Sequence, residues 1–166
     1  TISNDIINIY SYGVANLETA SVFDEFTICE IGSITKTFTG LLYAQLSYEG
    51  KLSLHDNAND YLPDNFQLPA KNGTEIQLVH LLAHTSGLPR EPEDLDPEEP
   101  FKYTEEQMSA YFEDVELLTV PGTEHLYSNT GAGMSGYILE QITGKSYSDL
   151  LKERIFNKLD MPSSFT

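Results

Sequence analysis

A serine and a lysine three residues apart form the first pair in this chain whose side chains could do nucleophilic chemistry. Ser33 and Lys36 stand at the start of an apolar helical pattern, where residues i and i+3 share a face, so the hydroxyl and the amine could meet. The unpaired N–H groups of a helix start could bind a developing oxyanion while Lys36 acts as a base for Ser33. The simpler interpretation is that Ser33 caps the helix and Lys36 is solvated.

A tyrosine and an asparagine two residues apart form a second candidate group. Tyr127 and Asn129 follow the chain break at Pro121-Gly122 and come just before another helical pattern. A phenol beside a lysine can relay a proton, and a side-chain amide can orient a carbonyl group. The alternative is a packed tyrosine and an asparagine that caps the helix.

The elements that must position these residues begin with two extended segments. Residues 6–14 alternate loosely and are rich in Ile and Tyr, which predicts a strand, and residues 26–31 predict a second extended segment. A helix is predicted from Ser33 to a stop signal at Gly50. Its inward face is expected to hold Ile34, Phe38, Leu41, Leu42 and Gln45.

Helical patterns dominate the rest of the chain. Short helical segments are predicted over residues 54–62 and 78–84. A capping box at Thr104 predicts the start of a further helix. The last two helices are predicted at about 129–144 and 146–158, so the order is two strands and then mostly helices.

The composition favours one folded domain and excludes several classes of function. The chain has 166 residues, and 26 acidic against 9 basic residues give a formal net charge of −17 at pH 7. A surface this acidic repels phosphate backbones and anionic lipids, which argues against a nucleic-acid partner. No apolar run approaches the length of a membrane span. Residues 90–100 combine acids with prolines and should form an exposed loop, whereas Cys29 should be a small buried residue.

Three patterns that could suggest a cofactor or a metal have better structural explanations. Residues 131–136 fit G-x-G-x-x-G, but the preceding segment is too short and polar for the buried strand of a dinucleotide site, so a helix with a small-residue face is expected. His80 and His84 are spaced i,i+4, yet the glutamate of the zinc-protease motif is missing. Asp56 and Asp60 flank an alanine that cannot bind calcium. No cofactor and no metal are therefore predicted.

Taken in order along the chain, the motifs resemble those of the serine β-lactamase and penicillin-binding protein superfamily. The similar strings are Ser33-x-x-Lys36, the sequence His-Thr-Ser-Gly-Leu-Pro at 84–89, Pro121-Gly122 and Tyr127-Ser128-Asn129. The Tyr-x-Asn string is similar to the branch that holds class C β-lactamases, DD-carboxypeptidases and esterases. The resemblance covers nearly the whole chain, to a matching stretch at 155–161.

The resemblance implies an α+β fold of the β-lactamase/transpeptidase type, an antiparallel sheet flanked by helices. Residues 1–166 would form a partial domain of this kind, with strands and the helix of the Ser-x-x-Lys motif at about 5–50 and a helical region at about 51–166. The remaining strands are expected to come from the rest of the same polypeptide or from a second chain, because two strands leave unpaired edges and a marginal core.

The resemblance also implies a role for each candidate site residue. Ser33 would be the acylated nucleophile, and its main-chain N–H would form half of the oxyanion hole. Lys36 would be its partner, Tyr127 the base or proton relay, and Asn129 the group that positions the substrate amide and Lys36. Whether Lys36 or Tyr127 takes the first proton stays open.

The expected function is that of a serine hydrolase acting on a small molecule or peptide through an ester, amide or β-lactam carbonyl. An esterase or peptidase-like hydrolase is favoured, and secretion or a periplasmic location follows from the resemblance alone. The third motif of the superfamily, Lys or His followed by Ser/Thr-Gly, does not occur in these residues, so the segment in isolation should be weakly active or inactive. The alternative is a non-catalytic binding or assembly domain.

Overall fold

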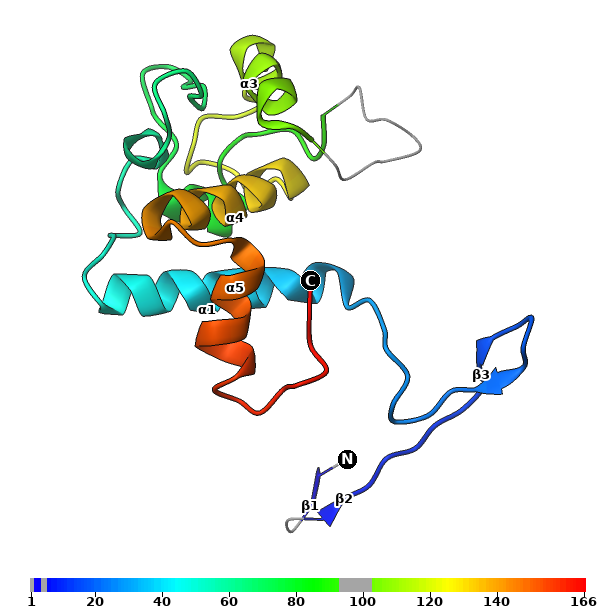
Figure 1. The fold of residues 1–166 in the computed structure, drawn as a ribbon. Coiled ribbons are helices and arrows are strands. Elements are labelled where there is room, and N and C mark those ends of the chain that lie inside the picture. The colour runs from blue at the N-terminus through cyan, green and yellow to red at the C-terminus, as the bar shows by residue number, and fades with distance from the viewer. Residues whose placement is uncertain (1, 4–5, 93–102) are drawn as a thin grey trace. The chain divides into compact units, whose positions relative to one another are not determined.

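Two units make up the chain, and each is described by itself. The computed structural model describes residues 2–3, 6–92 and 103–166. The units are Thr1–Gly32 and Ser33–Thr166 (Figure 1). The second unit contains the hydrophobic core and every α-helix of the described residues. Among these helices, none is both long and apolar enough to cross a membrane.

The first unit is built from two short antiparallel strand pairs. β1 (Ile2–Ser3) pairs with β2 (Ile6–Ile7), and β3 (Val14–Asn16) pairs with β4 (Ser21–Val22). A register shift between the two paired positions of β3 marks an irregularity in the second ladder. Pairs this short do not form an independently stable sheet.

The predicted strand over residues 6–14 is wrong in its extent. Only β2 and the first residue of β3 fall within it, and the residues between them are not in a strand. Local turn chemistry decides where pairing occurs, since the side-chain oxygen of Asn16 accepts the main-chain N–H groups of Glu18 and Thr19 at 2.9 Å and closes the turn between β3 and β4. When neither face of a strand is covered, a loose alternation of apolar residues specifies the pairing register only weakly.

The predicted extended segment at 26–31 forms no strand, and Cys29 is exposed rather than buried. A carboxylate oxygen of Asp24 accepts the N–H of Phe26 and the hydroxyl of Thr27, both at 3.0 Å, which stabilises a turn instead of an extended strand. Cys29 is not among the buried residues of the core, which lie in the second unit. Its burial was predicted from residue type alone.

Helices α1 and α4 form the centre of the second unit. The chain passes through a 3₁₀ turn, η1 (Gly32–Ile34), into α1 (Thr35–Tyr48), which ends before Gly50 as predicted. Helix α4 (Asn129–Thr143) lies beside α1, as Figure 1 shows. Then α5 (Tyr147–Leu151), which contacts both of these helices, continues into one π-helical turn, η3 (Lys152–Phe156).

The buried face of α1 differs from the predicted face. Ile34 is 59% exposed and Leu41 is 41% exposed, although both were expected to face inward. Leu42 is buried as expected. The buried stripe follows the spacing i, i+3, i+4, i+7 and consists of Thr39, Leu42, Tyr43 and Leu46.

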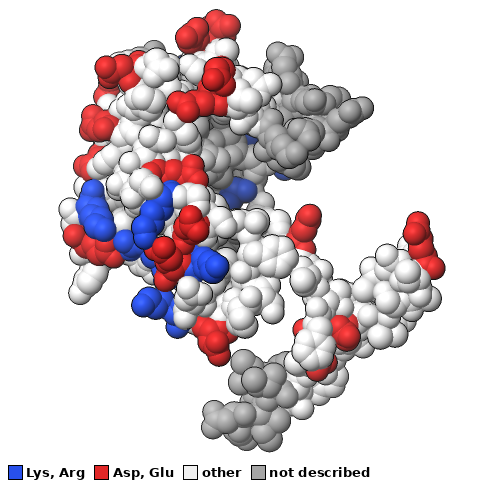
Figure 2. Space-filling view, viewed as in Figure 1, with Lys and Arg blue, Asp and Glu red and all other residues white. Residues whose placement is uncertain are grey.

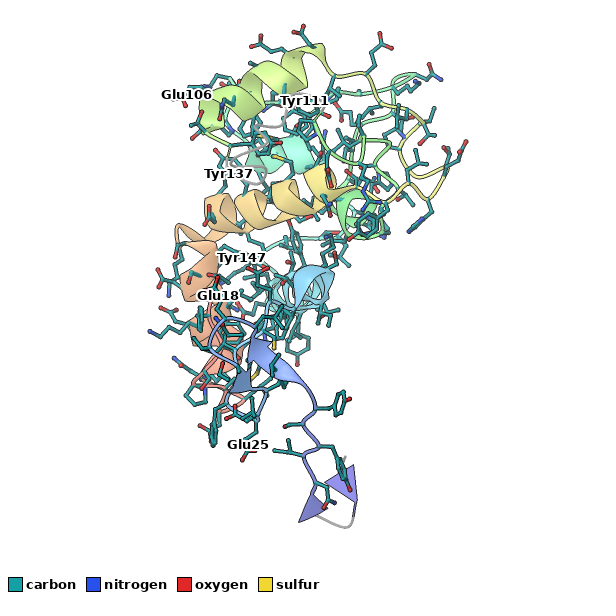
Figure 3. All side chains as sticks on the ribbon, turned by 90° about the vertical axis from the view of Figure 1, so that its right-hand side faces the viewer. Glu18, Glu25, Glu106, Tyr111, Tyr137 and Tyr147 are labelled. Atoms are coloured by element: carbon teal, nitrogen blue, oxygen red, sulfur yellow. The ribbon has the colours of Figure 1, made fainter. Side chains whose placement is uncertain are left out.

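Polar contacts to α4 and α5 explain this rotation of α1. The hydroxyl of Tyr43 donates to the main-chain carbonyl oxygen of Ser135 at 3.0 Å, and burial raises the pKa of Tyr43 so that it stays a donor. The hydroxyl of Thr39 lies 2.7 Å from that of Tyr147, which Figure 3 labels at the start of α5. A pattern based on hydrophobicity alone does not include these buried hydroxyl groups, whose pairing is needed when they leave water.

Shorter helices cover the other side of α4. They are η2 (Ala58–Tyr61), α2 (Leu78–Leu82) and α3 (Glu105–Asp114). The predicted capping box at Thr104 is confirmed, because its hydroxyl accepts the N–H of Gln107 while the Gln107 side chain accepts the N–H of Thr104. Most of the predicted loop at 90–100 lies outside the described residues.

Acidic side chains are spread over the visible surface, whereas most of the visible Lys and Arg gather in one area with acids between them (Figure 2). Ion pairs join Glu49 to Lys51 and to Arg154, and Lys145 to Glu153. The Arg154 and then the Lys51 hydrogen bond lower the pKa of Glu49 to about 2. The pair of Glu49 and Arg154 connects the end of α1 to η3, and solvent keeps the contribution of such surface pairs small.

Residues 84–89 form a compact turn that main-chain hydrogen bonds tie to later residues. Three carbonyl oxygens of this turn accept N–H groups at 2.7–2.8 Å, from Leu118, Gly122 and Leu126. Gly87 has φ +78°, and a β-carbon there would lie 2.3 Å from the carbonyl oxygen of Thr119. Only glycine therefore fits at this point of the turn.

The substitution Gly87→Ala should lower the free energy of unfolding by about 2–4 kcal/mol, since it adds both left-handed strain and a clash with main-chain atoms. Gly50→Ala is the matched control: Gly50 has φ +70°, but a β-carbon there would meet nothing within 4 Å, so this variant should lose only about 1 kcal/mol. Urea denaturation of both variants measures the difference. Equal losses would show that the close approach to Thr119 does not constrain the turn.

Candidate active site

Ser33 and Lys36 lie side by side at the junction of η1 and α1. Gly32 has φ +53° and turns the chain into η1, which places Ser33 at the exposed start of the helical segment. Lys36 lies one turn further along, and its Nζ donates a hydrogen bond to Ser33 Oγ at 3.2 Å. The same Nζ donates to Asn129 Oδ1 at 2.9 Å. Helical spacing thus brings together the hydroxyl and the amine.

Tyr127 contacts the same serine from the start of α4. Its hydroxyl lies 2.7 Å from Ser33 Oγ, and Lys36 Nζ lies 5.0 Å from the centre of its ring. The hydrogen bond to Lys36, followed by that to Ser33, holds the pKa of Tyr127 below its ordinary value of 10. The charge of Arg90, whose guanidinium carbon lies 5.3 Å from the ring centre, acts in the same direction.

Ser128, between the two candidate residues, fixes the start of α4. Its buried hydroxyl accepts the N–H of Gly131 at 2.9 Å and donates to the carbonyl oxygen of Pro89 at 2.7 Å. Ser128 is therefore the N-cap, and the alternative in which Asn129 caps the helix is wrong. The amide of Asn129 is left available for contacts in the site.

The imidazole of His84 supports this start from the turn at 84–89. Burial, and then the charges of Lys36 and His125, lower its pKa, so the ring is neutral near pH 7 and Nδ1 accepts the N–H of Ser128 at 3.2 Å. The ring also stacks on Tyr127 with centres 4.4 Å apart. His80 accepts the N–H of Gln77 through Nδ1 in a capping box. Each histidine thus has a hydrogen-bonding role of its own.

Asn129 connects the site to the residues that follow the turn. Its Nδ2 donates to Glu91 Oε1 at 2.8 Å, and its main-chain N–H donates to the carbonyl oxygen of Arg90 at 2.8 Å. Sequence reasoning assigned Arg90 and Glu91 to an exposed loop and missed both. The one available signal was their position directly after the turn at 84–89 of the recognised motif set.

The glycine pattern at 131–136 lies within α4, as the helical interpretation predicted. A β-carbon at Gly131 would lie 3.5–3.6 Å from side-chain atoms of Ser128, Ser86 and Leu81. At Gly136 the nearest atoms belong to Tyr147, at 3.7 Å. These small residues allow close packing of α4 on its neighbours, so the pattern has a structural explanation.

Comparison with known proteins identifies the family. A family model described as Beta-lactamase matches residues 1–166. The chain belongs to the beta-lactamase family. It is 33% identical over 166 residues to a beta-lactamase of Pseudomonas fluorescens, covering 99% of this chain and 44% of that protein. It is 34% identical over 137 residues to the D-alanyl-D-alanine-carboxypeptidase/endopeptidase AmpH of Escherichia coli K12, covering 81% and 36%.

The solved structures agree with the predicted fold class. A penicillin-binding protein from Bacillus halodurans superposes with a TM-score of 0.80 at 26% identity, covering 99% of this chain and 52% of that one. The chain therefore has the fold of the beta-lactamase and penicillin-binding protein family, and family members are serine hydrolases. It spans less than half the length of the curated relatives it matches.

The contacts of Tyr127 lead to a prediction that needs no substrate. Lys36→Met should raise the pKa of Tyr127 towards its ordinary value, because it removes the largest cause of the lowering. NMR titration of protein labelled with ¹³C at the tyrosine ζ carbons measures this, with Tyr127→Phe assigning the signal among 10 tyrosines. Lys51→Met, at a lysine that pairs with Glu49, is the control. Titration of Tyr127 at the same pH in the wild type and in both lysine variants would contradict this account of the site.

Proposed function

We propose that the protein carrying this chain is a serine hydrolase that forms an acyl-enzyme at Ser33. The observation that carries the proposal is the continuous set of hydrogen bonds among Tyr127, Ser33, Lys36 and Asn129. A serine hydroxyl is a weak nucleophile unless a base lies within hydrogen-bonding distance, and here a phenol and an amine both do. Family membership supports the same reaction class.

In the acylation step, Ser33 Oγ attacks the substrate carbonyl carbon while its proton passes to the oxygen of Tyr127. Tyr127 is the better candidate for the first base because it makes the shorter contact and its pKa is lowered. Lys36 donates to Ser33 Oγ and keeps the phenolate form accessible. The carbonyl electron pair moves onto oxygen, where the main-chain N–H of Ser33 supplies one donor.

The tetrahedral intermediate then collapses to an ester on Ser33. The bond to the leaving group breaks, and the departing oxygen or nitrogen takes the proton that Tyr127 holds. In deacylation, water attacks the ester carbonyl, Tyr127 accepts the proton of the water, and Ser33 Oγ leaves and recovers a proton from Tyr127. The same pair thus serves as base and acid in each half-reaction.

The substrate is an ester, an amide or a β-lactam, since the acyl group of each can be transferred to Ser33 as an ester. The relatives include proteins named beta-lactamase and D-alanyl-D-alanine-carboxypeptidase/endopeptidase. We favour an esterase or peptidase-like hydrolase, on the Tyr-Ser-Asn string at 127–129. Comparing turnover of nitrocefin with that of a p-nitrophenyl ester distinguishes these choices, and efficient nitrocefin turnover would favour a β-lactamase instead.

Labelling with a fluorophosphonate probe tests the nucleophile. In the protein at its full natural length, the probe should attach to Ser33, as located by peptide mass spectrometry, and Ser33→Ala should remain unlabelled. Ser109→Ala removes a hydroxyl on α3 that contacts the carbonyl oxygen of Asn65, and it should label normally. Labelling that persists in Ser33→Ala would overturn the proposed nucleophile, and a protein that never labels would favour a non-catalytic domain.

The rate of this labelling should depend on pH through Tyr127. Because Tyr127 accepts a proton only when deprotonated, the rate should rise with pH and level off above its pKa, which the contacts with Lys36 and Ser33 lower. Arg90→Gln removes another positive charge that lowers the pKa of Tyr127. In this variant, the rising limb of the plot of labelling rate against pH should therefore move to higher pH. Lys152→Gln removes an equal charge from η3 and should leave the limb in place. A Tyr127→Phe protein that keeps the wild-type profile would exclude Tyr127 as the base.

A further inference from the structure

His84 has a backbone conformation that residues other than glycine seldom adopt. It follows Ala83, the residue that caps the end of α2, and its φ is +56°. The left-handed region costs free energy for a residue with a β-carbon, and a helix that ends in it usually has glycine at this position. A strained residue beside a candidate active site indicates that its side chain has a task that glycine could not perform.

The imidazole ring of His84 contacts two consecutive residues at the start of α4. Its Nδ1 accepts the main-chain N–H of Ser128 at 3.2 Å. The centre of the ring lies 4.4 Å from that of Tyr127, with 34° between the ring planes. One contact therefore holds the main chain directly after Tyr127, and the other holds the Tyr127 side chain itself.

The position of the Tyr127 ring decides whether its hydroxyl reaches Ser33. The two oxygens are 2.7 Å apart, so a turn of the phenol ring about its side-chain bonds would lengthen the contact. Lys36 Nζ and the guanidinium carbon of Arg90 also lie over the ring, at 5.0 and 5.3 Å from its centre. Both of these groups end long flexible side chains, whereas the imidazole of His84 is a rigid ring that a main-chain hydrogen bond holds in place.

Protonation of His84 would break this arrangement. Because an imidazolium carries a hydrogen on both ring nitrogens, Nδ1 can accept the N–H of Ser128 only while the ring is neutral. After protonation two donors would face each other, and the ring would have to turn away from Ser128 and from Tyr127. The surroundings also oppose the charged form, since burial and then the charges of Lys36 and His125 lower the pKa of His84.

We propose that neutral His84 is a positioning residue that holds Tyr127 against Ser33, and that uptake of one proton by its imidazole moves Tyr127 out of place. The proposal rests on the proposed function, in which Tyr127 is the first base, and it adds regulation of that site by pH. The titratable and charged groups that face the imidazole are Tyr127, Lys36 and His125, and none of these three can offer a carboxylate to an imidazolium.

Two replacements of His84 separate its hydrogen bond from its ring contact. Asparagine tolerates the left-handed backbone, does not titrate, and carries Oδ1 close to the place of Nδ1, where it can accept the N–H of Ser128. Phenylalanine keeps a ring against Tyr127 but has no acceptor. Fluorophosphonate labelling at pH 8 should be about tenfold slower in His84→Phe, which leaves the N–H unpaired, and only about threefold slower in His84→Asn. Equal rates in the two variants would show that the hydrogen bond does not position Tyr127.

The slope of the labelling rate against pH counts the protons that must be lost. In the protein at its full natural length, the logarithm of the rate should rise with a slope of about one where only Tyr127 titrates. Below the pKa of His84 the slope should be about two, because His84 must lose a proton as well. His84→Asn should show a slope of about one throughout. His55→Asn, at a histidine that contacts Gln77 instead, is the matched control and should keep both slopes.

A titration by nuclear magnetic resonance tests the same contact without a substrate. The ¹⁵N signals of His84, assigned by their loss in His84→Asn, should be those of a neutral ring with its hydrogen on Nε2. The ¹³Cζ signal of Tyr127 should move at the pH where the His84 signals move, and this movement should be absent in His84→Asn. A Tyr127 signal that does not respond to His84 would overturn the proposal. Circular dichroism at each pH shows whether the protein stays folded over the range measured.

These measurements separate failure of this proposal from failure of the proposed function. If Ser33 labels but the wild type shows a slope of about one at every pH, His84 does not control Tyr127 and the nucleophile stands. A slope of about two that persists in His84→Asn would assign the second proton to another group and overturn the proposal. If Ser33 never labels while the Tyr127 signal still follows His84, the proposed function is wrong and the contact stands. Loss of the second proton in His84→Asn, with Ser33 labelled, supports both.

Discussion

The attachment of residues 84–91 to the first turn of α4 is the constraint on which the site depends. The hydroxyl of Ser128 links Pro89 to the helix start, and the carbonyl oxygen of Arg90 accepts the N–H of Asn129. Because Ser128 is buried and caps α4, its neighbours in sequence project from a fixed backbone. Tyr127 and Asn129 lie on either side of this capping serine. They thus contact Ser33 and Lys36 from a helix start that neither of them has to cap.

The orientation of the Asn129 amide follows from its two partners. Lys36 can only donate, so it must meet Oδ1, and an ionised Glu91 can only accept, so it must meet Nδ2. An amide turned the other way would place donor against donor and acceptor against acceptor. Glu91 therefore helps to hold Lys36 beside Ser33 through Asn129.

The sequence predicts the helices of this protein better than its strands, and the reason is local chemistry. The capping box at Thr104 and the glycine stops after α1 and α4 act within a few residues, so they can be recognised without a structure. The strand at 6–14 depended on pairing partners, and turn contacts of Asn16 set the observed pairing. Glu91 was missed for a related reason, since its partner Asn129 is 38 residues away.

The distances in the site are set by the packing of α1 on α4, because all four candidate residues lie at the first turns of these helices or directly before them. Ser33 and Lys36 belong to the start of α1, and Tyr127 and Asn129 to the start of α4. The two helices are joined far from the site by the buried hydrogen bond from Tyr43 to Ser135. Breaking this bond would leave a buried polar group unpaired and allow α1 to rotate, which moves Lys36 relative to Asn129. The packing of the hydrophobic core thus sets the relative positions of the four candidate residues, although none of its apolar side chains is one of them.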